Sequence, residues 1–368
     1  MRCENPAEKT AGEASPVSAA PPLLERLVKD AEAAGASDIH LQMVNGGADV
    51  SFRLDGVICP ILRLEEGIAE RVFGRIKYLA RLRTYDASLP QDGRIEKKDI
   101  GTQNDLRVAT YPTVTGEKIV LRLFAGAGVR SLAELDFPPE ALRALEAFLR
   151  QTSGLLLLTG PAGSGKTTTV YSCLRFLGEE PGRHVITIED PVEQIIPGMM
   201  QTEINEPRGL TFACAARHLL RQDPQVLVIG EIRDPETAEL AIRATLTGHL
   251  IMATLHAGST KAVFERLLAM CADRDAVIAA IALVLNQRLV RKLCSHCKGE
   301  GCNSCVNTGY RGRLPIVEWL SSTDSMRAEL RACGAASIEP SQNLKGSGDA
   351  LIGQGLTSPA EVRRVLGQ

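Results

Sequence analysis

The chain has 368 residues, of which 44 % are hydrophobic, so it is long enough for two ordinary domains with buried cores. Its formal net charge is −2, which argues against a protein that binds nucleic acid over a broad basic surface. The start resembles no signal peptide, and the longest uncharged apolar run, residues 276–285, is too short to cross a bilayer. We therefore expect a cytoplasmic protein.

The first part of the chain predicts a small α+β domain over residues 22–124. Residues 1–21 contain few large apolar side chains, so we expect them to be disordered. Asp55-Gly56 indicates a hairpin turn between two strands. The expected elements are helices at 22–34 and 68–82, and strands at 39–43, 49–54, 57–64, 93–96, 104–111 and 118–124, with a linker at 125–130.

From about residue 131 the pattern changes to continuous apolar strands that alternate with helices. This pattern predicts an α/β domain over residues 131–320, with a parallel sheet covered on both faces, followed by a helical segment at 321–368. Ligands of such sheets bind at the carboxyl ends of the strands. The expected strands are 154–159, 184–189, 225–230 and 249–254, and the expected helices are 139–151, 166–177, 212–221 and 235–247.

A glycine-rich loop follows the apolar strand at 154–159 and precedes a helix. Its residues are Gly160, Pro161, Ala162, Gly163, Ser164, Gly165, Lys166 and Thr167, followed by Thr168. Glycines allow backbone N–H groups to surround phosphate oxygens, and the helix N-terminus adds positive charge. Lys166 is placed to bind the β- and γ-phosphates and Thr167 to bind Mg²⁺. The sequence therefore predicts a P-loop that binds a nucleoside triphosphate.

Three polar residues follow other expected strands at the same edge of the sheet. Glu231 comes directly after the strand at 225–230, where we expect an acid that manages Mg²⁺ or the attacking water. Glu189 ends the strand at 184–189 and is placed to orient or deprotonate water, and His256 could contact the γ-phosphate. A structural role for His256 is the alternative. Asp234 is equally consistent with a helix N-cap.

Four cysteines form a compact pair of C-x-x-C motifs. They are separated by four residues and would direct four sulfur atoms toward one tetrahedral centre. A redox-active C-x-x-C is the competing interpretation. We expect a structural Zn²⁺ in a subdomain inserted at 294–305, bound by Cys294, Cys297, Cys302 and Cys305.

Taken together, these motifs resemble those of the secretion ATPases of type II secretion and type IV pilus assembly (the general secretory pathway protein E type). These are hexameric members of the RecA-like P-loop class. The resemblance covers about residues 22–320 and, more weakly, 354–365. The matching segments are 160–169, 187–193, 219–224, 230–234, 247–249, 255–256 and 307–313, with 36–40, 52–56 and 89–95 in the first domain.

The resemblance implies roles that the residues alone do not establish. Arg94 and Arg107 lie on expected strands, where arginines usually extend to solvent or pair with acids. By resemblance they are the arginines that the first domain moves over the nucleotide. Lys166 binds the β- and γ-phosphates, Glu231 is the acid of the second nucleotide-binding motif, Glu189 is a candidate for water activation, and the cysteines form the zinc subdomain of the assembly ATPases.

The chain also departs from the family pattern. Only about 20 residues precede the predicted α+β domain, so the family's first N-terminal domain is expected to be missing. The segment between the cysteine pairs is shorter than is usual in the family. Ala257, Gly258 and Ser259 follow His256 where the family usually has Thr, Asn and an acid.

The sequence and the resemblance lead to one functional hypothesis. We expect an ATPase that uses ATP, Mg²⁺ and Zn²⁺, forms a homo-hexamer peripheral to the inner membrane, and powers assembly of a pilus or pseudopilus. The expected partners are an inner-membrane platform protein and a cytoplasmic recruiting domain, without direct contact to nucleic acid. The alternatives are a nucleotide-gated scaffold with negligible turnover and the motor of a DNA-uptake pilus.

Overall fold

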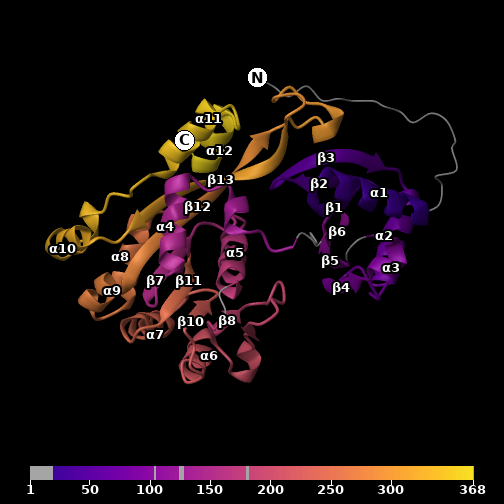
Figure 1. Ribbon diagram of the computed structural model, residues 1–368. Helices are drawn as coiled ribbons and strands as arrows, with labels where there is room; N and C mark the ends of the chain where they lie inside the picture. The colour runs from indigo at the N-terminus through magenta and orange to yellow at the C-terminus, as the bar shows by residue number, and fades with distance from the viewer. Residues whose placement is uncertain (1–19, 103–104, 124–127, 180–181, 368) are drawn as a thin grey trace. The chain divides into compact units, whose positions relative to one another are not determined.

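The computed structural model describes residues 20–102, 105–123, 128–179 and 182–367 (Figure 1). The chain divides into two compact units. Unit 1 comprises Met1–Gly126 together with Cys294–Arg311, and unit 2 comprises Ala127–Leu293 together with Gly312–Gln368. No helix among the described residues is both long and apolar enough to cross a bilayer.

Unit 1 is built on a six-stranded sheet with the strand order β3-β2-β1-β6-β5-β4, whose pairs are antiparallel. The helices α1 and α2 pack against each other and against this sheet, because both carry an apolar stripe that includes Leu24 and Ile76. The elements are α1 (Ala20–Ala34), β1 (Ala36–Val44), β2 (Gly47–Leu54), β3 (Val57–Leu64), α2 (Ile68–Leu79), β4 (Gln91–Ile95), α3 (Lys97–Ile100), β5 (Leu106–Thr113), β6 (Gly116–Leu123) and the short η3 (Asn303–Cys305).

Unit 2 is built on a seven-stranded sheet with the order β13-β12-β7-β11-β10-β8-β9. The strands from β12 to β9 are paired in parallel. They are β7 (Gly154–Thr159), β8 (Val185–Glu189), β9 (Met200–Glu203), β10 (Val226–Ile229), β11 (Leu250–Leu255), β12 (Ile281–Leu293) and β13 (Tyr310–Ser321).

Helices cover both faces of this sheet, as the sequence predicts. Leu155 and Leu157 of β7 belong to one hydrophobic core, whereas Leu156 and Leu158 belong to another, because successive side chains of a strand point to opposite faces. The helices are α4 (Pro139–Leu149) and α5 (Lys166–Gly178) on one face, and α6 (Phe212–Leu219), α7 (Pro235–Leu246), α8 (Thr260–Met270) and α9 (Arg274–Ala280) on the other (Figure 1).

The C-terminal segment is helical. Its elements are α10 (Asp324–Cys333), the 3-10 turn Ala335–Ser337, α11 (Leu344–Gly353) and α12 (Pro359–Leu366). Two further 3-10 turns of unit 2 lie earlier in the chain, at Leu132–Leu135 and Glu206–Arg208. The helices α11 and α12 pack on β12 around Val290 and Val362.

The structure differs from the sequence expectations in several places. Residues 20–21, which were expected to be disordered, begin α1. The rest of the expected disordered segment, 1–19, and residues 125–127 of the expected linker lie outside the described residues. α2 ends at Leu79 rather than 82, and Arg81 has a positive φ of 59°. β9, β12 and β13 were not among the predicted strands, and α3, α8 and α9 were not among the predicted helices. The cysteine segment, expected within the α/β domain, is grouped with unit 1.

Candidate nucleotide site

The phosphate loop of unit 2 joins the fully buried strand β7 to α5, as predicted. Gly160 has a φ of +139°, and a Cβ there would lie only 2.4 Å from the backbone oxygen of Gln287. Gly165, the N-cap of α5, has a φ of +95°. Both positions therefore require glycine for conformational or steric reasons. Thr167 and Thr168, in the first turn of α5, are exposed and can be reached by a ligand.

Lys166 lies folded over this loop. Its Nζ donates hydrogen bonds to the backbone oxygens of Gly160 (2.7 Å) and Pro161 (2.9 Å). Burial lowers the pKa of Lys166, while the charge of Glu231 raises this pKa and that of Arg288 lowers it. Lys166 has no carboxylate within ion-pair distance among the described residues. Its ammonium group is therefore held by neutral oxygens, which an anionic ligand can replace.

Glu231 and His256 lie together, although 24 residues separate them in the sequence. They follow β10 and β11, which are adjacent parallel strands, so their ends meet at one edge of the sheet. One carboxylate oxygen of Glu231 is 3.0 Å from Nε2 of His256, and the other accepts a hydrogen bond from Nε of Arg233 at 2.6 Å. Arg233 also reaches Asp190, just beyond β8, at 3.3 Å. The ends of three strands thus contribute to one polar cluster.

Glu189 occupies the end of β8 but is enclosed by hydrogen-bond donors. Its side chain accepts hydrogen bonds from Thr187 (2.5 Å) and Gln201 (3.0 Å) at one oxygen and from Tyr171 (2.5 Å) at the other. The Tyr171 hydroxyl in turn accepts the backbone N–H groups of residues 193 and 194, each at 3.1 Å. Burial, together with the hydrogen bond to Glu189, raises the pKa of Tyr171 to about 12. Glu189 therefore anchors the segment that follows β8.

The structure adds residues that sequence reasoning missed. Thr159, the last residue of β7, donates to the backbone oxygen of Ala257 (2.9 Å) and accepts its N–H (2.8 Å). Asn286 of β12 donates to the oxygen of Gly258 at 3.0 Å. These contacts fix the segment that follows His256. They depend on the register that places Thr159 opposite Asn286, for which the sequence has no local signal.

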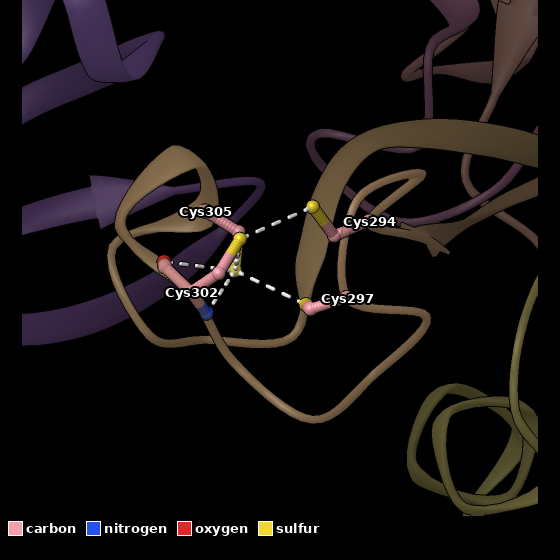
Figure 2. Close-up of side chains that lie close together, drawn as sticks. All are labelled: Cys294, Cys297, Cys302 and Cys305. Atoms are coloured by element: carbon pink, nitrogen blue, oxygen red, sulfur yellow. Dashed lines mark hydrogen bonds between the residues drawn. The ribbon is translucent and has the colours of Figure 1, made fainter.

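Figure 2 shows the side chains of Cys294, Cys297, Cys302 and Cys305 directed toward one another. Their sulfur atoms all lie within 4.8 Å of one another, and three pairs are 3.7–3.9 Å apart. Four thiolates around one tetrahedral Zn²⁺ with bonds of about 2.3 Å would be about 3.8 Å apart. The arrangement therefore fits a four-thiolate zinc site better than a two-cysteine redox centre.

Backbone N–H groups point at these sulfur atoms. Gly301 donates to Cys297 at 3.2 Å, and Gly309 donates to Cys305 at 3.3 Å. Burial alone would raise the pKa of Cys305, but N–H groups of Cys302 and Gly309 lower the pKa to about 6. Such bonds favour the thiolate form, which is the form that binds metal.

Arg94 and Arg107 lie in unit 1 on neighbouring strands, β4 and β5, with their Cα atoms opposite each other. These two residues belong to a row of cross-strand neighbours. The row continues to Arg122 of β6, which is opposite Arg107, and to Asp38 of β1, which is opposite Arg122. Arg94 donates to Asp105 at 3.0 Å, and Arg122 donates to Asp38 at 2.9 Å. Sequence reasoning missed Arg122, although the alternation of β6 places it on the same face as Arg107.

Comparison with known proteins supports the assignment of a nucleotide site to unit 2. The family model of the Type II/IV secretion system protein matches residues 13–364. Type II secretion system protein HxcR of Pseudomonas aeruginosa is 38 % identical over 93 % of this chain and 76 % of its own length. Type IV pilus assembly ATPase PilB of Thermus thermophilus is 38 % identical over 84 % of this chain but 38 % of its own length.

Solved structures share the fold. The pilus retraction motor PilT, solved with bound ADP, has a TM-score of 0.64 and 26 % identity, with 92 % of this chain and 96 % of PilT covered. The Legionella pneumophila ATPase DotB has a TM-score of 0.73 at 22 % identity, with 95 % of this chain and 97 % of DotB covered. From its motifs, its fold and these relatives, the chain belongs to the Type II/IV secretion system protein family and is an ATPase with the RecA-like P-loop fold.

Proposed function

We propose that this protein hydrolyses ATP to power assembly of a pilus or pseudopilus, as a homo-hexamer at the cytoplasmic side of the inner membrane. The observation that carries the proposal is the joint placement of Lys166 and the Glu231–His256 pair at the carboxyl edge of one parallel sheet. The relatives named as secretion and pilus assembly proteins support the coupling to assembly. The platform protein and recruiting domain expected from the sequence are part of the same proposal.

The phosphates would be held mainly by the loop and by Lys166. Lys166 is already beside Gly160, and the N-terminus of α5 adds its positive end. When bound, Mg²⁺ would be held by the exposed Thr167 hydroxyl and would neutralise phosphate charge. Phosphoryl transfer requires mainly positioning and electrostatic stabilisation, so these groups supply most of the catalysis.

We assign water activation to Glu231 rather than to Glu189. Glu231 keeps one fifth of its side chain exposed, whereas Glu189 is buried and accepts hydrogen bonds from three side chains. In the proposed step, a Glu231 oxygen takes a proton from water as the water oxygen attacks the γ-phosphorus and the bond to the ADP oxygen breaks. His256 and Arg233 hold the carboxylate in place from either side.

Arg94 and Arg107 complete the site in this proposal. They lie in unit 1, and in this proposal they contact the phosphates of a nucleotide bound to unit 2 of their own or a neighbouring subunit. Arginines that contact transition-state charge in this way raise turnover by about a thousandfold or more. Because Arg122 shares their row, we include it in the same group.

The zinc site has a structural role in the proposal. Cys294, Cys297, Cys302 and Cys305 would hold Zn²⁺ in a closed site, and the bound metal would organise the segment between β12 and β13. A closed four-thiolate site leaves no open position for substrate, so the metal takes no part in ATP hydrolysis.

The test combines turnover with assembly. Purified chain should hydrolyse ATP; Lys166→Ala should lose nucleotide binding, and Glu231→Gln should bind ATP and lose turnover by about a hundredfold or more. Glu236→Gln, an exposed acid in α7, is the matched control and should retain turnover. In the host, Lys166→Ala should abolish pilin assembly. ATP binding with negligible turnover in the unaltered chain would instead favour the scaffold, and intact assembly by the Lys166 variant would contradict the motor.

A further inference from the structure

A second cation, Arg288 of β12, lies against the phosphate loop. A Cβ at Gly160 would be 3.1 Å from its Nη1 atom. Its hydrogen bonds go to neutral oxygens: Nη1 donates to Oδ1 of Asn286 (2.6 Å) and to the backbone oxygen of Gln287 (2.8 Å), and Nη2 donates to the oxygen of Gly258 (3.2 Å). The guanidinium group is thus fixed beside the first glycine of the loop.

No carboxylate neutralises this guanidinium at close range. Among the described residues Arg288 has no ion pair, and Glu318, the acid whose charge acts on it, is occupied by the N–H of Thr260 at 2.6 Å. Burial lowers the pKa of Arg288, and its charge also lowers the pKa of Lys166. Two partly buried cations therefore lie at one end of the loop, an arrangement that an anion between them would stabilise.

The same place contains a buried hydroxyl without a partner. The Oγ atom of Ser164 is buried and makes no hydrogen bond, and a Cβ at Gly160 would lie 2.6 Å from it. A buried polar atom without a partner is costly, and a ligand oxygen would satisfy it. Lys166, Arg288 and Ser164 therefore all lie beside Gly160, and each can donate a hydrogen bond to an anionic ligand.

We propose that Arg288 is a further nucleotide-binding residue, whose guanidinium group contacts the β- or γ-phosphate of bound ADP or ATP from the β12 side. The assignment to these phosphates follows from Gly160, which Arg288 shares with Lys166. The planar guanidinium group suits two phosphate oxygens at once, which a lysine cannot match. This inference rests on the nucleotide site proposed above.

The test measures the affinity of the full chain for ADP, AMP and a non-hydrolysable ATP analogue by calorimetry. Arg288→Gln removes the charge but keeps a polar side chain with hydrogen-bond donors. We expect about a tenfold to hundredfold loss of affinity for ADP or the analogue, the usual range for one charge-assisted hydrogen bond, and little change for AMP. The affinity of Arg288→Lys for ADP and for the analogue should lie between those of the unaltered chain and of Arg288→Gln.

A matched control is Arg183→Gln. Arg183 also donates to backbone oxygens, those of residues 149 and 150, but it precedes β8 at the opposite edge of the sheet. If Arg288→Gln loses affinity for both ADP and the analogue, Arg288 contacts the β-phosphate. If it loses affinity for the analogue alone, Arg288 contacts the γ-phosphate. Unchanged ADP and analogue affinity in Arg288→Gln, or an equal loss for AMP, would overturn the inference. Failure of the unaltered chain to bind ADP would instead overturn the proposed nucleotide site.

Discussion

Units 1 and 2 support their functional groups in different ways. In unit 2, Lys166, Glu231 and His256 lie at the ends of buried parallel strands, and each already has a polar neighbour. In unit 1, the side chains of Arg94 and Arg107 are exposed on neighbouring strands of an antiparallel sheet. The cysteines of unit 1 lie on a loop whose only regular element is the turn η3.

This difference indicates what each site needs before it can act. Strand packing places the groups of unit 2, so their geometry exists without a ligand. The cysteines have little packing of their own, so metal binding supplies the order of that loop. The arginines are supported by the sheet, and in the proposed function they act only once they contact phosphate. The following predictions test each part of the comparison.

The largest expected effect is on the cysteine loop. Cys297→Ser should lose the single zinc per chain, because it removes one of the four thiolate ligands. The loop would then lose the apparent metal-binding free energy, about 10–16 kcal/mol in such closed sites, that organises it. Hydrogen exchange should then rise across residues 294–311 and stay unchanged in α5. Cys333→Ser, an exposed thiol outside the cluster, is the control. Elemental analysis that finds no zinc in the unaltered protein, purified without chelator, would reject the site.

Arg107→Ala should lower ATP turnover by about a thousandfold while ADP affinity changes only a few-fold, because the arginine acts on transition-state charge. The melting temperature should stay within the range of an exposed surface substitution. Arg63→Ala, on edge strand β3 with Asp49 as its partner, is the matched control and should retain turnover. Normal turnover with a lowered melting temperature would mean that Arg107 has a structural role instead.

Tyr171→Phe tests whether Glu189 supports structure rather than chemistry. The substitution removes the hydroxyl that donates to Glu189 and accepts two backbone N–H groups, so the free energy of unfolding should fall by about 1–3 kcal/mol. Turnover per folded molecule should change only a few-fold. Tyr78→Phe, an exposed tyrosine of α2, should change neither quantity. A large loss of turnover at unchanged stability would return Glu189 to a catalytic role.

The smallest effect concerns the attachment of α12 within unit 2. The fully buried carboxylate of Glu361 forms ion pairs with Arg291 of β12 and with Arg364. Burial alone would raise the pKa of Glu361, but these arginines lower this pKa from 4.5 to about 2. A lowered pKa stabilises the folded state above the unfolded value, so this contribution is lost as the pH falls from about 4.5 to about 2. Thermal unfolding of Glu361→Gln should therefore depend less steeply on pH in that range, whereas an unchanged slope would contradict the ion-pair account.

The sequence predicted the elements that have a local signal. The P-loop follows from its glycines and the apolar strand before it, and the cysteine cluster follows from its spacing. Arg288 and Thr159 could not be found, because their roles depend on the pairing of β12 with β7 across more than a hundred residues. Glu189 illustrates the opposite limit: its place at a strand end was predictable, but the three side chains that surround it were not.

β12 is the longest strand described, and it runs from Ile281 to Leu293. Arg288 lies on it beside the phosphate loop, and its last residue is bonded directly to the first cysteine of the cluster. The intervening five residues span about 17 Å of extended backbone, which resists stretching. Since pairing with β7 fixes β12 in the sheet, the metal loop begins at the end of a rigid strand, and loss of the metal should disorder the chain only beyond Leu293.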